Sequence, residues 1–262
     1  MNMQPKVSII MNCYNGEKYL KQSIGSILKQ SYKNWELIFW DNKSTDYSKK
    51  IVKKFNDKRI KYFYSKKFNK LYYSRNLAIR KATGKYICFL DADDYWKKNF
   101  IRDFLKKFTL EKCNIVISKY QIKHEKKKDI YINTKMKLPN ILTTQELLNN
   151  YIIGVNAIMI KKTILKKFKF NKDYNIIGDF DLFIKLSQLF NFYTINKPLA
   201  IYRVHDDNFS RKKLNIYVLE LKKWLKTTDQ VFKNKFNVDK IKIFLLKQKI
   251  KYFLAKVLMN KD

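Results

Sequence analysis

The sequence has few of the residues that form disulfides or flexible linkers. It contains three cysteines, five glycines and three prolines in 262 residues. Cys13, Cys88 and Cys113 are widely separated, odd in number and without C-x-x-C spacing, so we expect reduced core residues and no disulfide framework. No Gly/Ser-rich or Pro-rich linker divides the chain.

Long apolar runs are also missing. Residues 1–16 hold no apolar segment of signal-peptide length, and nowhere do 18 uncharged apolar residues follow one another. We therefore expect a cytoplasmic protein that can lie at the inner face of the cytoplasmic membrane.

Acidic residues are scarce, with 22 against 57 basic residues and a net charge of +35. Such an excess suggests a nucleic-acid partner, since basic side chains neutralise phosphates. However, only six of the basic residues are arginine, the type best suited to base readout. The lysines are spread over the whole chain, as an AT-rich coding sequence would produce. A basic nucleic-acid-binding protein is therefore the alternative hypothesis, and we expect no nucleic-acid partner.

Apolar residues are plentiful, at 46% hydrophobic and 16% aromatic, which is enough to fold a stable core. The length suits one large domain with a short appendage. The first half alternates between strand-like and helix-like periods, which predicts a mostly parallel sheet with ligands bound beyond the carboxyl ends of its strands. The expected strands cover residues 7–11, 36–40, 60–64 and 86–90, and the expected helices cover residues 17–30 and 74–82.

The pattern changes after residue 114 and predicts a mixed sheet. Expected there are a strand at 115–118, a hairpin of 119–123 with 130–132, strands at 156–160 and 192–195, and a helix at 179–190.

Beyond Ser210 the sequence is helical and basic. Two apolar stripes are expected to be packing faces, and the alternative is a basic amphipathic helix lying on a membrane. The stripes consist of Leu214, Val218, Leu221 and Leu225, and of Leu246, Ile250, Phe253 and Val257.

An acidic cluster, Asp91-Ala92-Asp93-Asp94, directly follows the strand at 86–90. Alternate residues Asp91 and Asp93 can point to the same side, where their oxygens suit Mg²⁺ or Mn²⁺, ions that in turn bind diphosphates. For Asp94 we favour capping of a helix that begins near Lys97.

A second acidic cluster, Gly178-Asp179-Phe180-Asp181, opens the predicted helix at 179–190. Acidic residues in a first helical turn complement the helix dipole, which by itself would explain them. A metal-bound diphosphate donor, however, also requires a base for an attacking hydroxyl, and one of these carboxylates could supply it.

Taken together, the motifs resemble those of the family 2 glycosyltransferases. The resemblance covers roughly residues 5–210, and each motif alone is weak, whereas their order and spacing are specific. They are residues 7–15, Trp40-Asp41-Asn42-Lys43-Ser44-Thr45-Asp46, Ser74-Arg75-Asn76, residues 89–94, Gly178-Asp179-Phe180-Asp181-Leu182 and the closing segment from Tyr202-Arg203-Val204-His205 to Ser210.

The resemblance implies an α/β GT-A fold at residues 1–210, with a Rossmann-like nucleotide-binding half at 1–113 and an acceptor half at 114–210. Residues 211–262 would form a basic helical extension. It also implies inverting transfer of a hexose or N-acetylhexosamine from a nucleotide-sugar, with a UDP-sugar expected, to a lipid-linked or glycan acceptor of lipopolysaccharide, lipooligosaccharide or capsule. A degenerate transferase that acts only as a binding partner is a further alternative.

The same resemblance assigns roles to individual residues. The base and ribose would be held by Asn12, Tyr14, Asp41 and Asn42. Asp93 would be the principal ligand of Mn²⁺ or Mg²⁺, and Asp179 would be the general base.

Three further residues receive less specific roles. Asp91 would assist the ribose or the metal, and His205 would contact the metal or a phosphate. Arg75 would reach the nucleotide or its phosphates, unless it forms a salt bridge on a helix surface.

Two positions depart from the family pattern. Asn42 stands where a second aspartate is usual, so the identity of the nucleotide base stays open. Gly178 stands where Glu frequently precedes the catalytic Asp, so we expect a less elevated pKa for Asp179 than in a paired site. Asp181 is the reserve candidate for the base.

Overall fold

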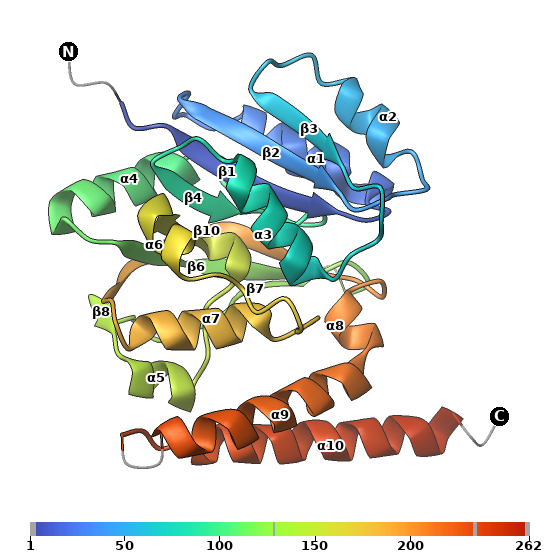
Figure 1. Ribbon diagram of the computed structural model, residues 1–262, viewed down its shortest axis with the longest axis vertical. Coiled ribbons are helices and arrows are strands. Elements are labelled where there is room, and N and C mark those ends of the chain that lie inside the picture. Colours follow the sequence, from blue (N-terminus) through green and yellow to red (C-terminus); the bar gives the residue numbers. More distant parts are fainter. Residues whose placement is uncertain (1–3, 128, 233–234, 260–262) are drawn as a thin grey trace.

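The computed structural model describes residues 4–127, 129–232 and 235–259. Residues 1–3 and 128 of the predicted catalytic domain, and residues 233–234 and 260–262 of the predicted extension, lie outside this description. The described residues form one sheet of ten strands with helices on both faces (Figure 1).

The strands run in the order β3-β2-β1-β4-β9-β6-β10-β5, with β7 added beside β6 and β8 beside β10. They are β1 (Val7–Cys13), β2 (Trp35–Asp41), β3 (Ile60–Tyr64), β4 (Tyr86–Phe89), β5 (Tyr95–Trp96), β6 (Ile115–His124), β7 (Ile130–Ile132), β8 (Ile141–Leu142), β9 (Ile158–Lys161) and β10 (Phe192–Val204). β1 to β4 pair in parallel, and β9 is antiparallel to both of its neighbours. The prediction of a mixed, mostly parallel α/β sheet is therefore confirmed.

Helices cover both faces of this sheet, because its strands carry apolar side chains on both sides. In β1, Val7, Ile9 and Met11 pack with α1, α2 and α4, whereas Ile10 packs into the opposite layer. The helices are α1 (Glu17–Leu28), α2 (Ser48–Lys53), α3 (Leu71–Lys81), α4 (Phe100–Glu111), α5 (Thr144–Asn149), α6 (Lys162–Lys167), α7 (Gly178–Ser187), α8 (Phe209–Lys212), α9 (Leu214–Phe232) and α10 (Asp239–Met259). A short 3-10 helix covers Val155–Ala157.

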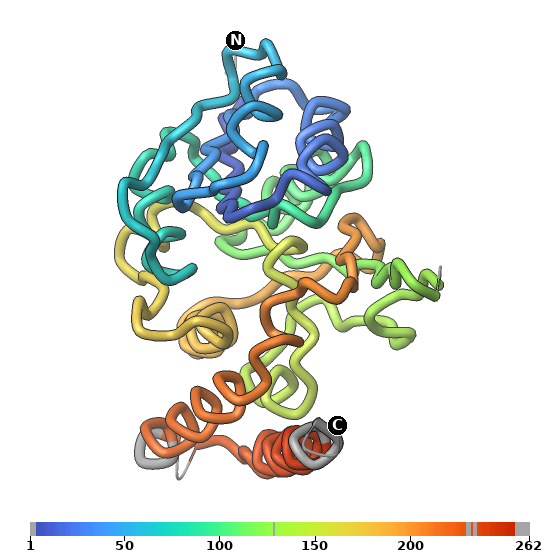
Figure 2. The backbone as a smooth tube through the Cα atoms, turned by 90° about the vertical axis from the view of Figure 1, so that its right-hand side faces the viewer, coloured from blue at the N-terminus to red at the C-terminus, as the bar shows by residue number. Residues whose placement is uncertain are grey.

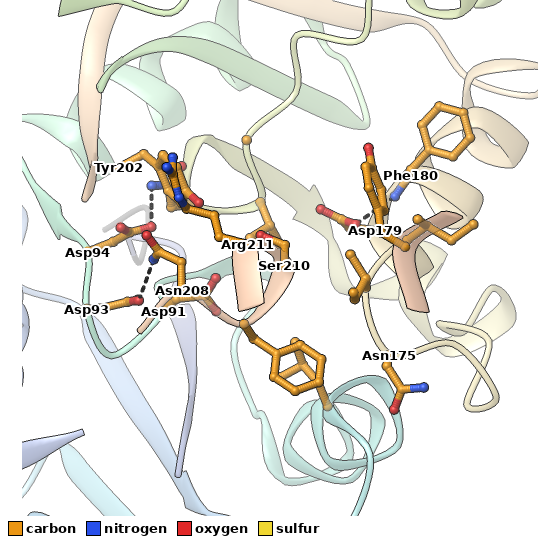
Figure 3. A pocket seen from close by; sticks show the side chains of 18 of the residues that line it. Asp91, Asp93, Asp94, Asn175, Asp179, Phe180, Tyr202, Asn208, Ser210 and Arg211 are labelled. Atoms are coloured by element: carbon orange, nitrogen blue, oxygen red, sulfur yellow. Dashed lines mark hydrogen bonds between the residues drawn. The ribbon is translucent and has the colours of Figure 1, made fainter. Parts of the chain in front are cut away.

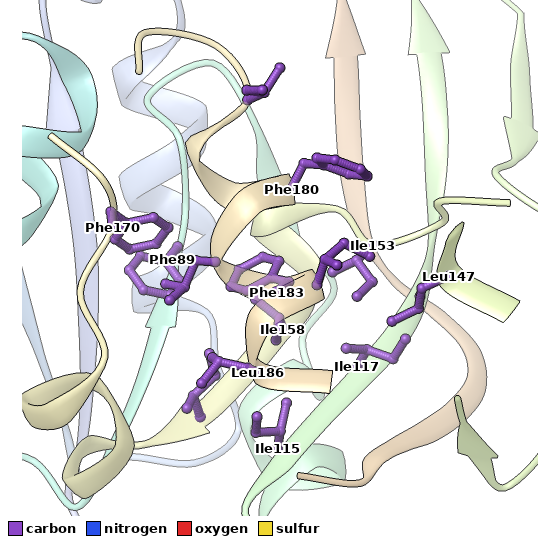
Figure 4. Close-up of a cluster of buried hydrophobic side chains, with 14 of the residues drawn as sticks. Phe89, Ile115, Ile117, Leu147, Ile153, Ile158, Phe170, Phe180, Phe183 and Leu186 are labelled. Atoms are coloured by element: carbon purple, nitrogen blue, oxygen red, sulfur yellow. The ribbon is translucent and has the colours of Figure 1, made fainter. Parts of the chain in front are cut away.

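The core between the sheet and α7 fixes the position of that helix. Phe183 and Leu186 point from α7 into a cluster with Phe89, Ile117 and Ile158 of the sheet (Figure 4). Because Phe183 and Leu186 are fully buried, the start of α7 can shift little relative to the end of β4.

Some predicted boundaries were wrong. β6 runs without a break from Ile115 to His124, whereas we predicted a separate strand at 115–118 and a hairpin strand at 119–123. The predicted pairing with residues 130–132 is confirmed, because β6 pairs with β7. β10 extends far beyond residue 195 because its later residues pair with β6 and β5. These pairings join distant segments, so local periodicity could not reveal them.

The C-terminal helices α9 and α10 lie side by side beneath α5 and α7 (Figures 1 and 2). Three of the four residues in the stripe predicted on α9 pack as expected: Leu221 is buried, and Val218 and Leu225 pack against the same core cluster as α7. Leu214 is not part of this cluster. The α9 part of the predicted extension is thus docked on the rest of the described chain.

The prediction that the apolar stripe on α10 is a packing face was wrong. Its described side chains are exposed, at 57%, 52% and 65% for Leu246, Ile250 and Phe253. The side chain of Val257 lies outside the described part. Instead, α10 packs through Ile241 and Leu245, which lie on the side that contacts α9 and α5. No described helix is long and apolar enough to cross a membrane.

Candidate active site

A cavity of about 1020 Å³ opens at the carboxyl ends of β1 and β4. It continues past the start of α7 to the C-terminal helices. Figure 3 shows Asp91, Asp93 and Asp94 on one side and Asp179 on the opposite side, with Asn208 of the closing segment beside the first group. Seven of the nine predicted site residues line it: Asn12, Tyr14, Arg75, Asp91, Asp93, Asp179 and His205.

Arg75 and Asp91 form an ion pair at the floor of this cavity. Nη2 of Arg75 donates to Oδ1 of Asp91 at 2.6 Å. Burial raises the pKa of Asp91 and the nearby Arg75 opposes this rise. The side chain of Arg75 is only 3% exposed, so the alternative of a salt bridge on a helix surface was wrong.

Asp93 faces the cavity beside two residues of the closing segment. Its Oδ2 lies 3.0 Å from Nε2 of His205 and 3.4 Å from Nδ2 of Asn208. The backbone N–H of Asp207 points at Nδ1 of His205 at 3.1 Å, which favours a proton on Nε2. In this tautomer His205 donates to Asp93 and orients its carboxylate.

Asp94 does not cap a helix, so that prediction was wrong. Its carboxylate accepts from the backbone N–H of Arg203 at 2.8 Å and from Nδ2 of Asn156 at 2.6 Å. α4 begins only at Phe100, because Tyr95–Trp96 first forms strand β5 against β10. Burial and the neighbouring carboxylates raise the pKa of Asp94 strongly, and its contacts tie the end of β4 to β10.

Asn12, at the end of β1, is a buried polar residue with unused hydrogen-bonding capacity. It is 8% exposed, and neither Oδ1 nor Nδ2 has a hydrogen-bond partner among the described residues. Unsatisfied buried amides are costly, and this one borders the cavity. A ligand with both donors and acceptors would satisfy it. Tyr14, by contrast, is 52% exposed at the rim and makes an edge contact with Phe68.

The structure does not bring Asp41 and Asn42 to the cavity wall. Asp41 accepts from the backbone N–H of Ser44 and from the hydroxyl of Tyr62. Asn42 binds the backbone of Asn69 through its side-chain amide: Nδ2 donates to the carbonyl oxygen, and Oδ1 accepts from the N–H. Both side chains are buried, and their hydrogen bonds anchor the loops after β2 and β3.

Asp179 stands at the start of α7. Its Oδ1 accepts from the hydroxyl of Tyr72 at 2.9 Å and from the backbone N–H of Phe180 at 2.9 Å. Burial raises the pKa of Asp179, while Arg75 and the hydrogen bond from Tyr72 lower it. A carboxylate with a raised pKa that borders a cavity is suited to accept a proton near neutral pH.

Gly178 provides the space that Tyr72 needs. A Cβ atom at this position would lie 2.5–2.7 Å from three ring atoms of Tyr72. The departure from the family pattern therefore has a steric reason: the ring of Tyr72 occupies the space that a side chain at 178 would need. Asp181, the reserve candidate, pairs with Lys185 at 2.9 Å and does not line the cavity.

Asp91 and Asp93 are suited to a metal ion that is bound partly by the protein and partly by the substrate. Among the described residues, no three His, Cys, Asp or Glu side chains are grouped to hold a metal by themselves. Mg²⁺ and similar ions are often held by one or two carboxylates together with substrate phosphates and water. Asp93, assisted by Asp91, matches that donor set.

Sequence reasoning does not find three residues that shape the site: Tyr72, Asn208 and Glu220. Tyr72 precedes Arg75 by three positions on α3, and this helical spacing could have placed both on one face. Asn208 lies inside the closing segment. Glu220 of α9 has no local signal, because its contacts are with residues 175–177.

Comparison with known proteins decides the family. The model of Glycosyl transferase family 2 matches residues 8–183. This chain belongs to glycosyl transferase family 2. It is 31% identical over 217 residues to a putative teichuronic acid biosynthesis glycosyltransferase, TuaG, of Bacillus subtilis, covering 81% of this chain and 84% of that protein. It is also 31% identical over 208 residues to an Escherichia coli UDP-Glc:alpha-D-GlcNAc-diphosphoundecaprenol beta-1,3-glucosyltransferase, WfaP, covering 79% and 80%.

Solved structures of other transferases share the fold. TarS residues 1–349 of S. aureus with UDP-GlcNAc gives a TM-score of 0.66 at 19% identity, over 84% of this chain and 66% of that chain. The mannosyltransferase PcManGT of Pyrobaculum calidifontis with GDP-Man and Mn²⁺ gives 0.64 at 16% identity, over 86% and 65%. The chain is thus a family 2 glycosyltransferase with a GT-A fold that spans about two thirds of these solved chains.

Proposed function

We propose that the protein transfers a hexose or N-acetylhexosamine from a UDP-sugar to a hydroxyl of a lipid-linked acceptor in bacterial surface-glycan synthesis. The observation that carries the proposal is a single cavity bordered by Asn12, Asp91, Asp93 and Asp179. Relatives named as acting with UDP-glucose on a diphosphoundecaprenol-linked sugar support this donor and acceptor class.

The donor would lie along the side of the cavity formed by β1 and β4. The unsatisfied amide of Asn12 would bind the nucleoside, with the ring of Tyr14 at the rim. Asp93, aligned by His205 and Asn208, would hold Mn²⁺ or Mg²⁺ with help from Asp91. Such a cation, when bound, neutralises charge on the donor diphosphate.

Asp179 would act on the acceptor. As the acceptor oxygen bonds to the anomeric carbon, the bond from that carbon to the diphosphate oxygen breaks, and UDP departs with the bonding electrons. The acceptor hydroxyl proton passes to the carboxylate of Asp179, whose Oδ1 stays fixed by Tyr72 and Phe180. Attack from the side opposite UDP inverts the anomeric centre.

Replacement of Asp93 tests this donor arrangement. Asp93→Asn should lower turnover of UDP-sugars by about 10²-fold or more, since electrostatic stabilisation of the leaving group is commonly worth that much. Mn²⁺ should raise the calorimetric affinity of the unchanged protein for UDP and not that of the variant. Asp206→Asn is the control, because Asp206 is exposed and does not line the cavity. Full turnover by Asp93→Asn in EDTA would refute the proposal.

The helix α10 supports peripheral binding to an anionic membrane, where a lipid-linked acceptor would be held. Lysines are interleaved with the exposed apolar residues Leu246, Ile250 and Phe253. Lys240 and Lys251 of the same helix border the cavity. Lysines near an anionic bilayer contribute about 1 kcal/mol each, and the apolar side chains can enter its interface.

Vesicle sedimentation tests this membrane contact. The protein should bind phosphatidylglycerol-containing vesicles more strongly than pure phosphatidylcholine vesicles, and salt should weaken the binding. The double variant Ile250→Glu, Phe253→Glu should bind less. Equal binding by the variant would mean that α10 is not the contact surface.

A further inference from the structure

We infer that Glu220 of α9 is a positioning residue for Asp179, so that the C-terminal extension completes the active site. This inference rests on the proposed role of Asp179 as the base. Glu220 lies outside the segment that matches the family model, which ends at residue 183.

Glu220 is a buried carboxylate, 8% exposed, that is bonded to backbone rather than to a cation. Oε1 accepts from the backbone N–H and side-chain Nδ2 of Asn175 at 2.6 and 3.0 Å. Oε2 accepts from the N–H groups of Ile176 and Ile177 at 2.9 and 3.2 Å. No salt bridge to Glu220 occurs in the part of the chain that the structure describes.

These hydrogen bonds lie directly before α7. Ile177 is the residue that precedes the first turn of the helix, and Asp179 is in that turn. A carboxylate at a helix N-terminus is favoured by the unpaired N–H groups and by the helix dipole. Glu220 therefore fixes the three residues that lead into α7, and through them it restrains the position of Asp179 in the first turn.

The peptide groups of Ile176 are held from two sides. The N–H donates to Glu220, and the carbonyl oxygen lies 2.7 Å from the hydroxyl of Tyr72, whose one proton it shares with Asp179. The same hydroxyl lies 2.9 Å from Oδ1 of Asp179. If the contact with Glu220 is lost, residues 175–177 can move away from Tyr72. The carboxylate of Asp179 then loses its fixed position.

The test compares Glu220→Gln, Glu220→Asp and Leu225→Ala in the full chain. Glutamine keeps the size but presents an NH₂ group to backbone donors, so kcat should fall about 10-fold to 10²-fold, as expected for a displaced catalytic group. The affinity for UDP should stay within about 2-fold, because the donor side is untouched. Glu220→Asp should recover part of kcat.

Leu225→Ala is the matched control, since Leu225 lies on α9, packs against the core and does not line the cavity. It should lower thermal stability and keep kcat. Hydrogen exchange at the amides of residues 175–177 should accelerate in Glu220→Gln and not in the control. Unchanged kcat or unchanged exchange in Glu220→Gln would overturn the inference, as would an equal loss of kcat in Leu225→Ala.

Asp179→Asn separates the two proposals. If Asp179→Asn is inactive and Glu220→Gln is fully active, only the positioning role fails. If Asp179→Asn keeps full activity, the assignment of the base fails, while the exchange experiment still reports whether Glu220 holds the loop.

Discussion

The two sides of the cavity are built in different ways. On the proposed donor side, Asn12 lies in β1, and Asp91 and Asp93 lie in the turn that follows β4, which pairs in parallel with β1. On the proposed acceptor side, the carboxylate of Asp179 accepts a hydrogen bond from Tyr72 of α3, and Glu220 of α9 binds the backbone of the segment before it. The donor side therefore takes its position from the sheet, with added side-chain contacts from Arg75 and His205. The acceptor side takes its position from a few tertiary contacts that single substitutions can remove.

Loss of the acceptor-side carboxylate should have the largest effect. Asp179→Asn removes the proposed base and should lower kcat by about 10²-fold to 10⁴-fold while calorimetric UDP binding persists. Asp181→Asn is the control, since its carboxylate pairs with Lys185 and does not line the cavity. If Asp181→Asn were the inactive variant, the reserve candidate would be the base.

Filling the space at Gly178 should have the next largest effect. Gly178→Ala places a methyl group 2.5 Å from the ring of Tyr72, so the ring or the start of α7 must move. We expect a loss of about 1–3 kcal/mol in unfolding free energy, as for other overpacked sites, and a clear drop in kcat measured below the melting temperature. Gly25→Ala in α1 meets no atom within 4 Å and should be neutral or stabilising. Full activity of Gly178→Ala would show that the close packing is not needed.

Removal of the Tyr72 hydroxyl should have the smallest effect, and it should change the pH dependence of kcat/KM in a specific direction. The hydrogen bond from Tyr72 lowers the pKa of Asp179, so Tyr72→Phe should raise that pKa. A base must be deprotonated, and the acid limb of the kcat/KM profile should therefore move to higher pH. Tyr47→Phe, an exposed residue outside the cavity, is the control. If the acid limb of the kcat/KM profile does not move in Tyr72→Phe, Tyr72 does not lower the pKa of Asp179 during catalysis.

The donor side could be predicted well from the sequence. Short apolar runs followed by polar residues mark buried strands and their carboxyl ends, and parallel strands bring those ends to one edge. Asp91 and Asp93 were found in this way, and Asn12 came from the resemblance to the family. Asp41 and Asn42 follow a strand too, but the structure uses their side chains to bind neighbouring loops.

By itself the sequence determined the α/β class, the parallel strands, the family and seven of the residues that line the cavity, because strand periodicity and motif order are local properties. Only the tertiary structure decided that Asp94 ties β4 to β10, that Gly178 accommodates Tyr72 and that Glu220 binds the segment before α7. These features join residues far apart in the chain. Their energies come from burial and hydrogen-bond geometry, which appear only once the helices pack on the sheet.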